Sequence, residues 1–405
     1  MERTTAGGLQ SLRDANRRLV IQALSGRGVA SRAEIARITG LSRSTVSSLV
    51  NDLQKTGLIV EREVTDEPHS AQVGRPPVLI ALSPSAGAAI GIDFGHSHIA
   101  VAIGDLSHTV LAEHWQEIDV DHLAHEGLDA AAELVTNALH EAGIERNRVV
   151  GVGMGLPGPI SDEQQTVGST SILPGWVGVN AADEMARRLG MPVSVENDAN
   201  LGALSECVWG AGRGAPDVAY IKASSGIGAG LVIGGRLHRG VGGTAGEIGH
   251  TPFREDGEVC RCGNRGCLET VARADVITRS VRAGRGESLS IADVIKLAHA
   301  GDPPAQRVIA DAGRAIGVGV ANLCNLLNPR RVIVGGELSA AGDVLLGPLR
   351  DSLDRYAIPT AAADVTVVPG ELGKRAEVMG ALALVLSDPS SGVAHELSRA
   401  SGALA

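Results

Sequence analysis

Three cysteines and one histidine form the most chemically distinctive group in this sequence. Cys260, Cys262 and Cys267 lie within eight residues, and His250 precedes them by ten residues. Soft thiolates combined with an imidazole favour zinc, and a closed set of four such ligands is typical of a structural site. We therefore predict a structural zinc ion bound by these four residues. The alternative is three reduced cysteines that are merely close in sequence.

A second group of residues with chemical potential lies near the N-terminus. Arg43 is followed by small hydroxyl side chains, namely Ser44, Thr45, Ser47 and Ser48. Arginine and small polar side chains at the exposed start of a helix can reach base edges in the major groove of DNA. We predict these five residues to be DNA contacts.

Three short helices are expected to position this group. Apolar spacing predicts a first helix from Leu9 to Leu24. Ser31 and Glu34 have the three-residue spacing of a capping box, which starts a second helix that runs to Gly40. Ser42 is the expected N-cap of a third helix. The third helix has one apolar face, formed by Val46, Leu49, Val50 and Leu53. The last two helices and their tight turn are typical of a helix-turn-helix.

Two strands and a polar loop follow these helices. Residues 58–63 and 78–82 are the expected strands, and the loop between them contains Arg75 before two prolines. The prolines hold the backbone extended and leave Arg75 projecting, which suits a narrow minor groove. The alternative is a linker arginine that only contacts solvent. Residues 1–82 are thus predicted to form a winged helix-turn-helix DNA-binding domain, here called the head.

Charge is distributed unevenly along the chain. Residues 1–77 carry eleven Arg and Lys against eight Asp and Glu, a net charge of +3. Residues 78–405 carry a net charge of −13, so the whole chain has a net charge of −10. A basic head on an acidic body fits nucleic-acid binding that is confined to the head.

Length and composition limit the class of protein. At 405 residues the chain is long enough for two to four domains, and 44% hydrophobic and 20% charged residues exclude a disordered chain. No apolar run reaches the ~18 residues that span a bilayer, and the N-terminus lacks a signal peptide's apolar stretch. We expect a cytoplasmic protein with no membrane partner, in which residues 387–405 form a flexible tail.

The remainder of the chain contains a series of ordered motifs. An apolar strand at 88–95 ends in Asp93-Phe94-Gly95, and a second strand starts at His98. Alone, this pattern also fits an ordinary hairpin. Further motifs follow at 155–159, 193–200, 225–230, 246–250, 260–269 and 328–336. In order and spacing these segments resemble the ROK family (repressors, open reading frames and sugar kinases), over nearly the whole chain. The winged helix-turn-helix ahead of them is similar to the branch of xylose and N-acetylglucosamine repressors.

That resemblance implies an α/β fold in which the winged helix-turn-helix precedes a two-lobed, actin-like (ribonuclease H-like) body. The expected first lobe is 83–198, completed by a helix near 373–386, and the second is 199–372 with the zinc loop. A sugar or sugar phosphate is expected in the cleft between the lobes. By resemblance its contacts are Asn197, Asp198, Glu247, His250 and Glu269.

The resemblance further implies a sugar-responsive regulator that represses genes of carbohydrate uptake or use. Its partner would be double-stranded operator DNA, read by a homodimer or homotetramer, because a helix-turn-helix usually reads a two-fold repeat. A zinc-stabilised scaffold without DNA or ligand is a third class of function.

An active ATP-dependent sugar kinase that also binds DNA is the main alternative. Asp198 matches the general base of the family's kinases. The phosphate loops depart from the kinase pattern, because the first reads Asp93-Phe94-Gly95-His96-Ser97-His98 instead of Asp-x-Gly-Gly-Thr. The second reads Ser224-Ser225-Gly226 instead of Gly-Thr-Gly. We therefore expect no catalytic residue in this chain.

Overall fold

The N-terminal helices of the computed structural model match the expected head. The structure describes residues 4–62, 78–158, 160, 173–282 and 289–386. The head contains α1 (Thr4–Ser25), α2 (Arg32–Thr39) and α3 (Arg43–Lys55). The capping box of Ser31 and Glu34 is present at the start of α2, and Ser42 caps α3 by accepting from the Thr45 amide. The predicted apolar face of α3 is buried.

A three-stranded antiparallel sheet completes the head. Its order is β1-β3-β2, with β1 (Val29–Ser31), β2 (Ile59–Arg62) and β3 (Leu79–Leu82). The two predicted wing strands are confirmed, whereas β1 was not expected, because three residues are too few to produce a strand pattern. The loop with Arg75 lies outside the described residues.

The apolar face of α1 is buried only in part. Val20, Ile21 and Leu24 are fully buried, whereas Leu12 is 59% and Leu19 is 39% exposed. The apolar spacing from which the sequence predicts this helix includes Leu12 and Leu19, and it therefore overstates how much of the helix contacts the core.

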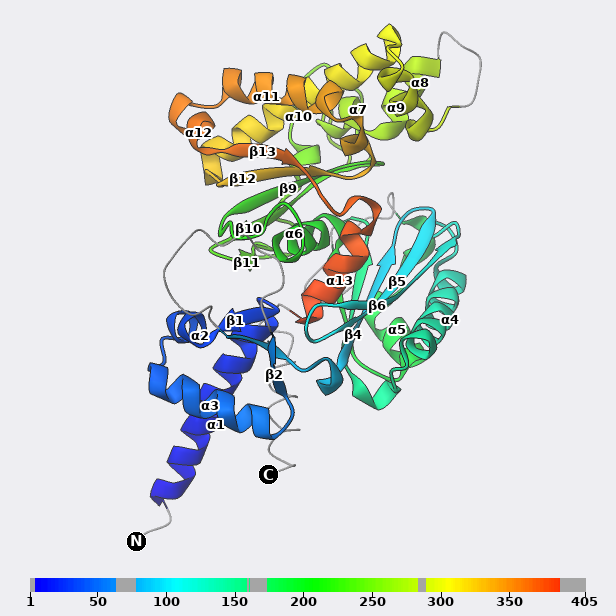
Figure 1. The fold of residues 1–405 in the computed structure, drawn as a ribbon. Helices are drawn as coiled ribbons and strands as arrows, with labels where there is room; N and C mark the ends of the chain where they lie inside the picture. Colours follow the sequence, from blue (N-terminus) through cyan, green and yellow to red (C-terminus); the bar gives the residue numbers. More distant parts are fainter. Residues whose placement is uncertain (1–3, 63–77, 159, 161–172, 283–288, 387–405) are drawn as a thin grey trace.

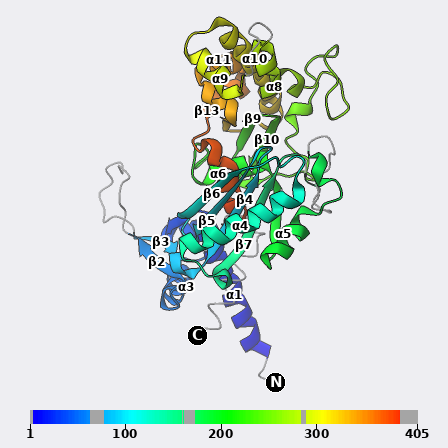
Figure 2. The ribbon, with the colours of Figure 1, turned by 90° about the vertical axis from the view of Figure 1, so that its right-hand side faces the viewer.

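The first lobe is built on a five-stranded sheet of order β6-β5-β4-β7-β8. β4, β5 and β6 form an antiparallel meander, and β7 and β8 add parallel strands. Their bounds are β4 (Ala88–Phe94), β5 (His98–Asp105), β6 (Val110–Glu117), β7 (Val149–Leu156) and β8 (Val193–Asn197). α4 (Ala124–Ala142) and α5 (Ala181–Leu189) cover one face of this sheet (Figure 2).

The second lobe repeats this strand order in the sheet β11-β10-β9-β12-β13. The strands are β9 (Val218–Ala223), β10 (Ile227–Ile233), β11 (Arg236–Leu237), β12 (Arg331–Gly335) and β13 (Thr366–Pro369). The helices of this lobe are α7 (Glu269–Ala272), α8 (Ala274–Arg282), α9 (Ile291–His299), α10 (Pro303–Leu327), α11 (Asp343–Tyr356) and α12 (Pro359–Asp364). The repeated meander with two added parallel strands confirms the two-lobed, actin-like body.

Two helices lie between the sheets, α6 (Asp198–Val208) and α13 (Ala376–Leu386) (Figure 1). α13 packs directly on β4 and β7, because Gly91 and Gly153 have no side chain to hold it away. A Cβ at Gly153 would lie 2.1 Å from the Ala381 carbonyl oxygen. α6 packs against β9 and β10 and also against α13.

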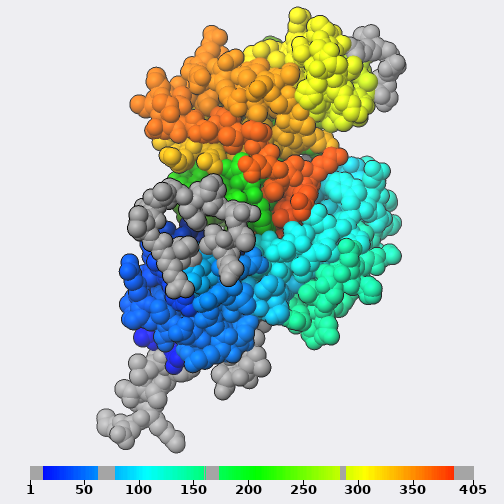
Figure 3. Space-filling model, viewed as in Figure 1, coloured from blue at the N-terminus to red at the C-terminus, as the bar shows by residue number. Residues whose placement is uncertain are grey.

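The head and the first lobe share one apolar core. Side chains from α1, α3 and the wing strands, such as Leu24 and Ile80, pack in the same cluster as Ala102 of β5 and Leu382 of α13. The space-filling view accordingly shows the head in contact with the first lobe (Figure 3). None of the described helices is long and apolar enough to cross a membrane.

Candidate functional site

A cavity that is open to solvent lies where the ends of the two sheets meet. Its wall includes backbone of the first lobe at Gly158, the start of α6, the end of β9 and the loop after β11. All five residues expected to contact a sugar line it, namely Asn197, Asp198, Glu247, His250 and Glu269. The structure therefore brings together side chains that are spread over more than seventy residues of sequence.

The start of α6 fixes two of these residues. Asn197 is the N-cap, and its Oδ1 accepts hydrogen bonds from the amides of Ala199 and Asn200. Its side-chain amide donates to the Gly158 carbonyl at 2.8 Å, which joins α6 to the loop after β7. Asp198 Oδ1 accepts from the Ala199 amide at 2.8 Å. These bonds hold both side chains at the edge of the cavity.

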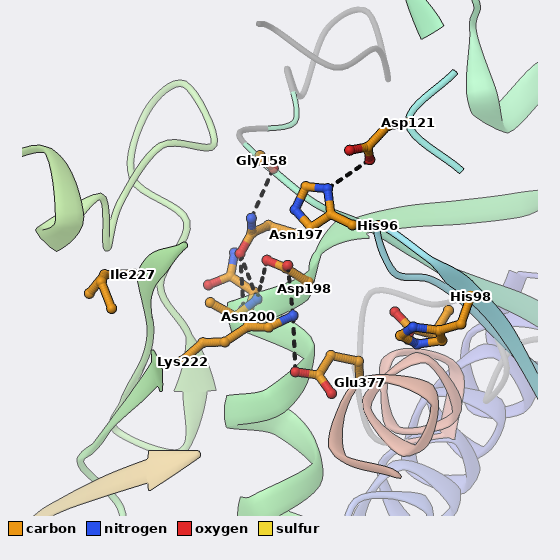
Figure 4. Close-up of polar contacts among 12 residues, drawn as sticks. His96, His98, Asp121, Gly158, Asn197, Asp198, Asn200, Lys222, Ile227 and Glu377 are labelled. Atoms are coloured by element: carbon orange, nitrogen blue, oxygen red, sulfur yellow. Dashed lines mark hydrogen bonds and ion pairs between the residues drawn. The ribbon is translucent and has the colours of Figure 1, made fainter. Parts of the chain in front are cut away.

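Sequence reasoning missed a lysine at the centre of the site. Lys222 Nζ lies 2.8 Å from Asp198 Oδ2 and 3.1 Å from Glu377 Oε1 (Figure 4). Burial alone would lower the pKa of Lys222, but the carboxylates of Asp198, Glu377 and Asp93 outweigh it and raise that pKa well above its ordinary value. Burial raises the pKa of Glu377. The available signal was a single lysine within the apolar strand 218–223.

Glu269 is buried, with 2% of its surface exposed, and both of its oxygens are bonded. Oε2 accepts from the Ile227 amide at 3.1 Å, and Oε1 accepts from Arg261 Nε at 2.7 Å. Glu269 thus fixes the loop between β9 and β10 while facing the cavity. Arg261 was not expected in the site from the sequence.

Glu247 is a carboxyl group of the cavity whose pKa is strongly shifted. Burial, together with the charges of Asp198 and Glu269, raises the pKa of Glu247 to about 7, although Arg261 opposes this shift. Near neutral pH this group is therefore able to donate as well as accept a hydrogen bond, which suits a ligand hydroxyl.

The four predicted metal ligands converge. The ligand atoms of His250, Cys260, Cys262 and Cys267 all lie within 4.8 Å of one another. Cys262 Sγ is 3.7 Å from Cys267 Sγ, and Cys260 Sγ is 3.5 Å from His250 Nδ1. Tetrahedral zinc with Zn–S of ~2.3 Å and Zn–N of ~2.0 Å places such atoms roughly 3.5 to 3.8 Å apart. The donor set and its spacing therefore fit a metal ion.

The two ring nitrogens of His250 face different partners. Nδ1 faces Cys260, and Nε2 lies 3.7 Å from Glu247 Oε2 on the cavity side. One residue thus links the cysteine cluster to the cavity wall.

The segment 93–98, which corresponds to the first phosphate loop of the family's kinases, is occupied by the imidazole of His98. The His98 ring lies over Gly95, where an added Cβ would be 2.1 Å from the ring carbon Cε1. His98 Nε2 is 3.1 Å from Asp93 Oδ2, and the ring stacks on Trp115 with centroids 3.8 Å apart. His96 lines the cavity, with Nδ1 2.7 Å from Asp121 Oδ1 (Figure 4).

The predicted DNA-contacting residues lie along the start of α3. Arg43, Ser44 and Ser48 are exposed, whereas Thr45 and Ser47 are half-buried. An exposed arginine at the N-terminal end of the second helix of the helix-turn-helix is positioned as major-groove contacts require. Arg75 cannot be placed, since it lies outside the described residues.

Comparisons with known proteins agree with this architecture. Residues 89–388 match the ROK family, and residues 16–68 match the MarR family. The chain belongs to the ROK family. It is 30% identical over 390 residues to the xylose repressor of Caldicellulosiruptor bescii, which covers 93% of this chain and 96% of that protein.

Two solved structures are similar to different extents of the chain. A ROK family transcriptional regulator, a homologue of the Escherichia coli Mlc protein, has a TM-score of 0.77 at 26% identity and covers 96% of this chain and 99% of its own. A ROK family glucokinase from Streptomyces griseus, in complex with glucose and AMPPNP, has a TM-score of 0.66 at 31% identity. It covers 74% of this chain and 99% of its own.

Proposed function

We propose that this chain is a sugar-responsive DNA-binding transcriptional repressor of carbohydrate uptake or use genes. The observation that carries the proposal is a winged helix-turn-helix that shares its core with a body whose cleft presents carboxylate, amide and imidazole groups. Such groups bind sugar hydroxyls and reject ligands that leave them unpaired. The similarity to a xylose repressor over 93% of the chain supports the same function.

The residues divide into three sets under this proposal. The sugar contacts are Asn197, Asp198, Glu247, His250 and Glu269. The DNA contacts are Arg43, Ser44, Thr45, Ser47, Ser48 and Arg75. Structural zinc would be held by His250, Cys260, Cys262 and Cys267, and would supply the cross-link that keeps the loop of Glu247 folded.

The same proposal sets the domains and partners. We assign residues 1–82 to the head, 83–198 with the helix of 373–386 to the first lobe, and 199–372 to the second. The regulator would act in the cytoplasm on double-stranded operator DNA as a homodimer or homotetramer, because two heads read a two-fold operator.

The charge of the cleft favours an unphosphorylated sugar over a sugar phosphate. Asp198, Glu247 and Glu269 face the cavity, while the basic groups Lys222 and Arg261 are both held by carboxylates. A phosphate dianion would lie near this acidic wall at an electrostatic cost. An uncharged sugar only needs hydrogen-bond partners.

The alternative is an ATP-dependent sugar kinase that also binds DNA. The similarity to a glucokinase structure and the presence of Asp198 favour it. Two observations weigh against it: the His98 ring lies over Gly95 in the first phosphate loop, and Asp198 Oδ2 already accepts from Lys222. We therefore propose a sensor without catalytic residues.

A thermal-shift screen followed by operator release tests the proposal. The screen compares D-glucose, D-xylose and their phosphates, because a ligand at 100 times its Kd adds about 2.7 kcal/mol to stability. We expect an unphosphorylated sugar to stabilise the protein and to weaken its binding to a DNA duplex selected from a random library. Turnover of ATP with either sugar, without DNA binding, would contradict the proposal.

A further inference from the structure

Two helices start at the sugar site and are joined there by one lysine. Asp198 is the first residue of α6, and Glu377 is the second residue of α13. Lys222 Nζ bridges their carboxylates at 2.8 and 3.1 Å. A ligand that draws Asp198 toward the cavity must therefore act on the starts of both helices.

The same two helices are packed too closely to move independently. A Cβ at Gly380 of α13 would lie 2.1 Å from the Leu201 carbonyl oxygen of α6. Leu201, Ala381 and Leu384 form a buried apolar cluster between them. Because such packed interiors transmit displacement, the pair is expected to shift as one unit.

The ends of both helices connect to Ser25 of the head, α13 directly and α6 through His108. Trp209 caps the C-terminus of α6, and its indole Nε1 donates to the His108 carbonyl at 3.1 Å. His108 Nε2 in turn donates to the Ser25 carbonyl at 2.6 Å. At the end of α13, the Leu386 carbonyl accepts from Ser25 Oγ. Ser25 is the last residue of α1.

We propose that Lys222, α6 and α13 form the route that couples the sugar site to the DNA-binding head, with Trp209 and Ser25 as the positioning residues at its far end. This inference rests on the proposed function. Sugar bound at Asp198 displaces the two helices. Because α13 contacts Ser25 directly and α6 reaches it through His108, this displacement reorients α1. Operator affinity then changes without any direct contact between sugar and head.

The test separates coupling from binding in the full-length protein. Trp209→Phe keeps an aromatic ring but removes the indole donor to His108. Trp176→Phe is a matched control, because its indole Nε1 donates at 2.8 Å to the Val120 carbonyl within the first lobe. Affinity for D-glucose and D-xylose is measured by calorimetry. Affinity for the selected duplex is measured by fluorescence anisotropy at fixed salt, with and without each sugar at saturation.

The parent protein is expected to lose duplex affinity by roughly 5- to 150-fold with a bound sugar, the range typical of allosteric coupling. Trp209→Phe should keep its sugar affinity and its sugar-free duplex affinity within about twofold of the parent's values. The fold-loss of duplex affinity that sugar causes should be at least ~3-fold smaller than in the parent. Trp176→Phe should respond as the parent does. A merely structural role of Trp209 would instead change the two basal affinities.

Ser25→Ala provides a second reading if Trp209→Phe does not fold. It removes the Oγ contact with Leu386 at the end of α13 and should also reduce the response at unchanged sugar affinity. If the parent responds to sugar and both variants respond equally well, the route is wrong and the proposed function stands. If the parent binds neither sugar nor duplex, the proposed function is wrong, and the proposed route is wrong as well.

Discussion

Lys222 and Asp198 form an ion pair of 2.8 Å across the site, and Glu377 completes it from the other side of the lysine. Removing one partner of a fully buried ion pair costs about 3 to 5 kcal/mol, because it leaves unpaired charge behind. The side chains of Lys222 and Asp198 are 18% and 16% exposed, so solvent screens part of this cost. Lys222→Met should therefore lower the free energy of unfolding in urea titrations by less than that, about 1 to 3 kcal/mol. The double variant Lys222→Met with Glu377→Gln should recover part of the loss. Lys296→Met, at a side chain 79% exposed, is the control. Equal stability of Lys222→Met and the parent would contradict the role given to this pair.

Asp198→Asn is expected to separate sugar sensing from DNA binding. The change removes the carboxylate at the cavity edge, while the exposed start of α3 is untouched. Operator affinity without sugar should stay at the parent's value, and release by sugar should be weak. Asp311→Asn, at a surface ion pair of α10, serves as the control. Anisotropy titrations with sugar check this, and parent-like release by Asp198→Asn would be evidence for a different ligand site.

Arg43→Ala should weaken operator binding by about 1 to 3 kcal/mol if its guanidinium makes a bidentate base contact. Specificity should relax at one position of the site. Arg314→Ala, an exposed arginine of the second lobe, should leave binding unchanged. A footprinting titration in which both variants match the parent would exclude Arg43 as a base contact.

Metal analysis of the reduced protein should find one zinc ion per chain. Cys262→Ser removes a thiolate ligand and should lower both zinc content and sugar affinity, because the loop that carries Glu247 loses its cross-link. Cys207→Ser, outside the four-residue cluster, should keep both. Full zinc content in Cys262→Ser would show that the ligand set is wrong.

The free energy of unfolding should decrease below pH 6.5 because of His108. Desolvation lowers the pKa of His108 from 6.5, while the Ser25 hydrogen bond and Asp105 act to raise it. The His108 imidazole is therefore protonated more readily in the unfolded chain than in the folded chain. The stability is complete above pH 6.5 and declines as pH falls toward the folded pKa.

His108→Asn tests this directly. Asparagine tolerates the positive φ of 68° at this position and does not titrate. Urea unfolding at about pH 7.5 and about pH 5.5 should show a smaller acid loss in the variant than in the parent. An identical loss in both proteins would assign the acid sensitivity to other groups.

Local patterns explain why much of the head was predictable. Ser31 and Glu34, or Ser42 and Thr45, interact across three residues, so their geometry is contained in the sequence that forms it. The cysteine cluster is similar, because Cys260, Cys262 and Cys267 lie within eight residues of the chain. The residues expected to contact a sugar came from resemblance, and the structure does bring them to one cavity.

Contacts between distant segments were not predictable. Nothing near Lys222 in the sequence points to Glu377, which reaches it only because α13 returns to pack on the first sheet. His108 and Ser25 are 83 residues apart, and their contact depends on how the head packs against the body. Such pairs follow from the tertiary arrangement, which no periodic pattern in the sequence encodes.

The core shared by the head and the first lobe determines how this regulator can be re-engineered. Cutting the chain after Leu82 would expose apolar side chains on both pieces, so a free head is expected to aggregate or unfold. Grafting a head from another repressor would require its junction residues as well. New operator preferences are therefore most easily reached by changing the exposed residues at the start of α3, since these substitutions leave the shared core intact.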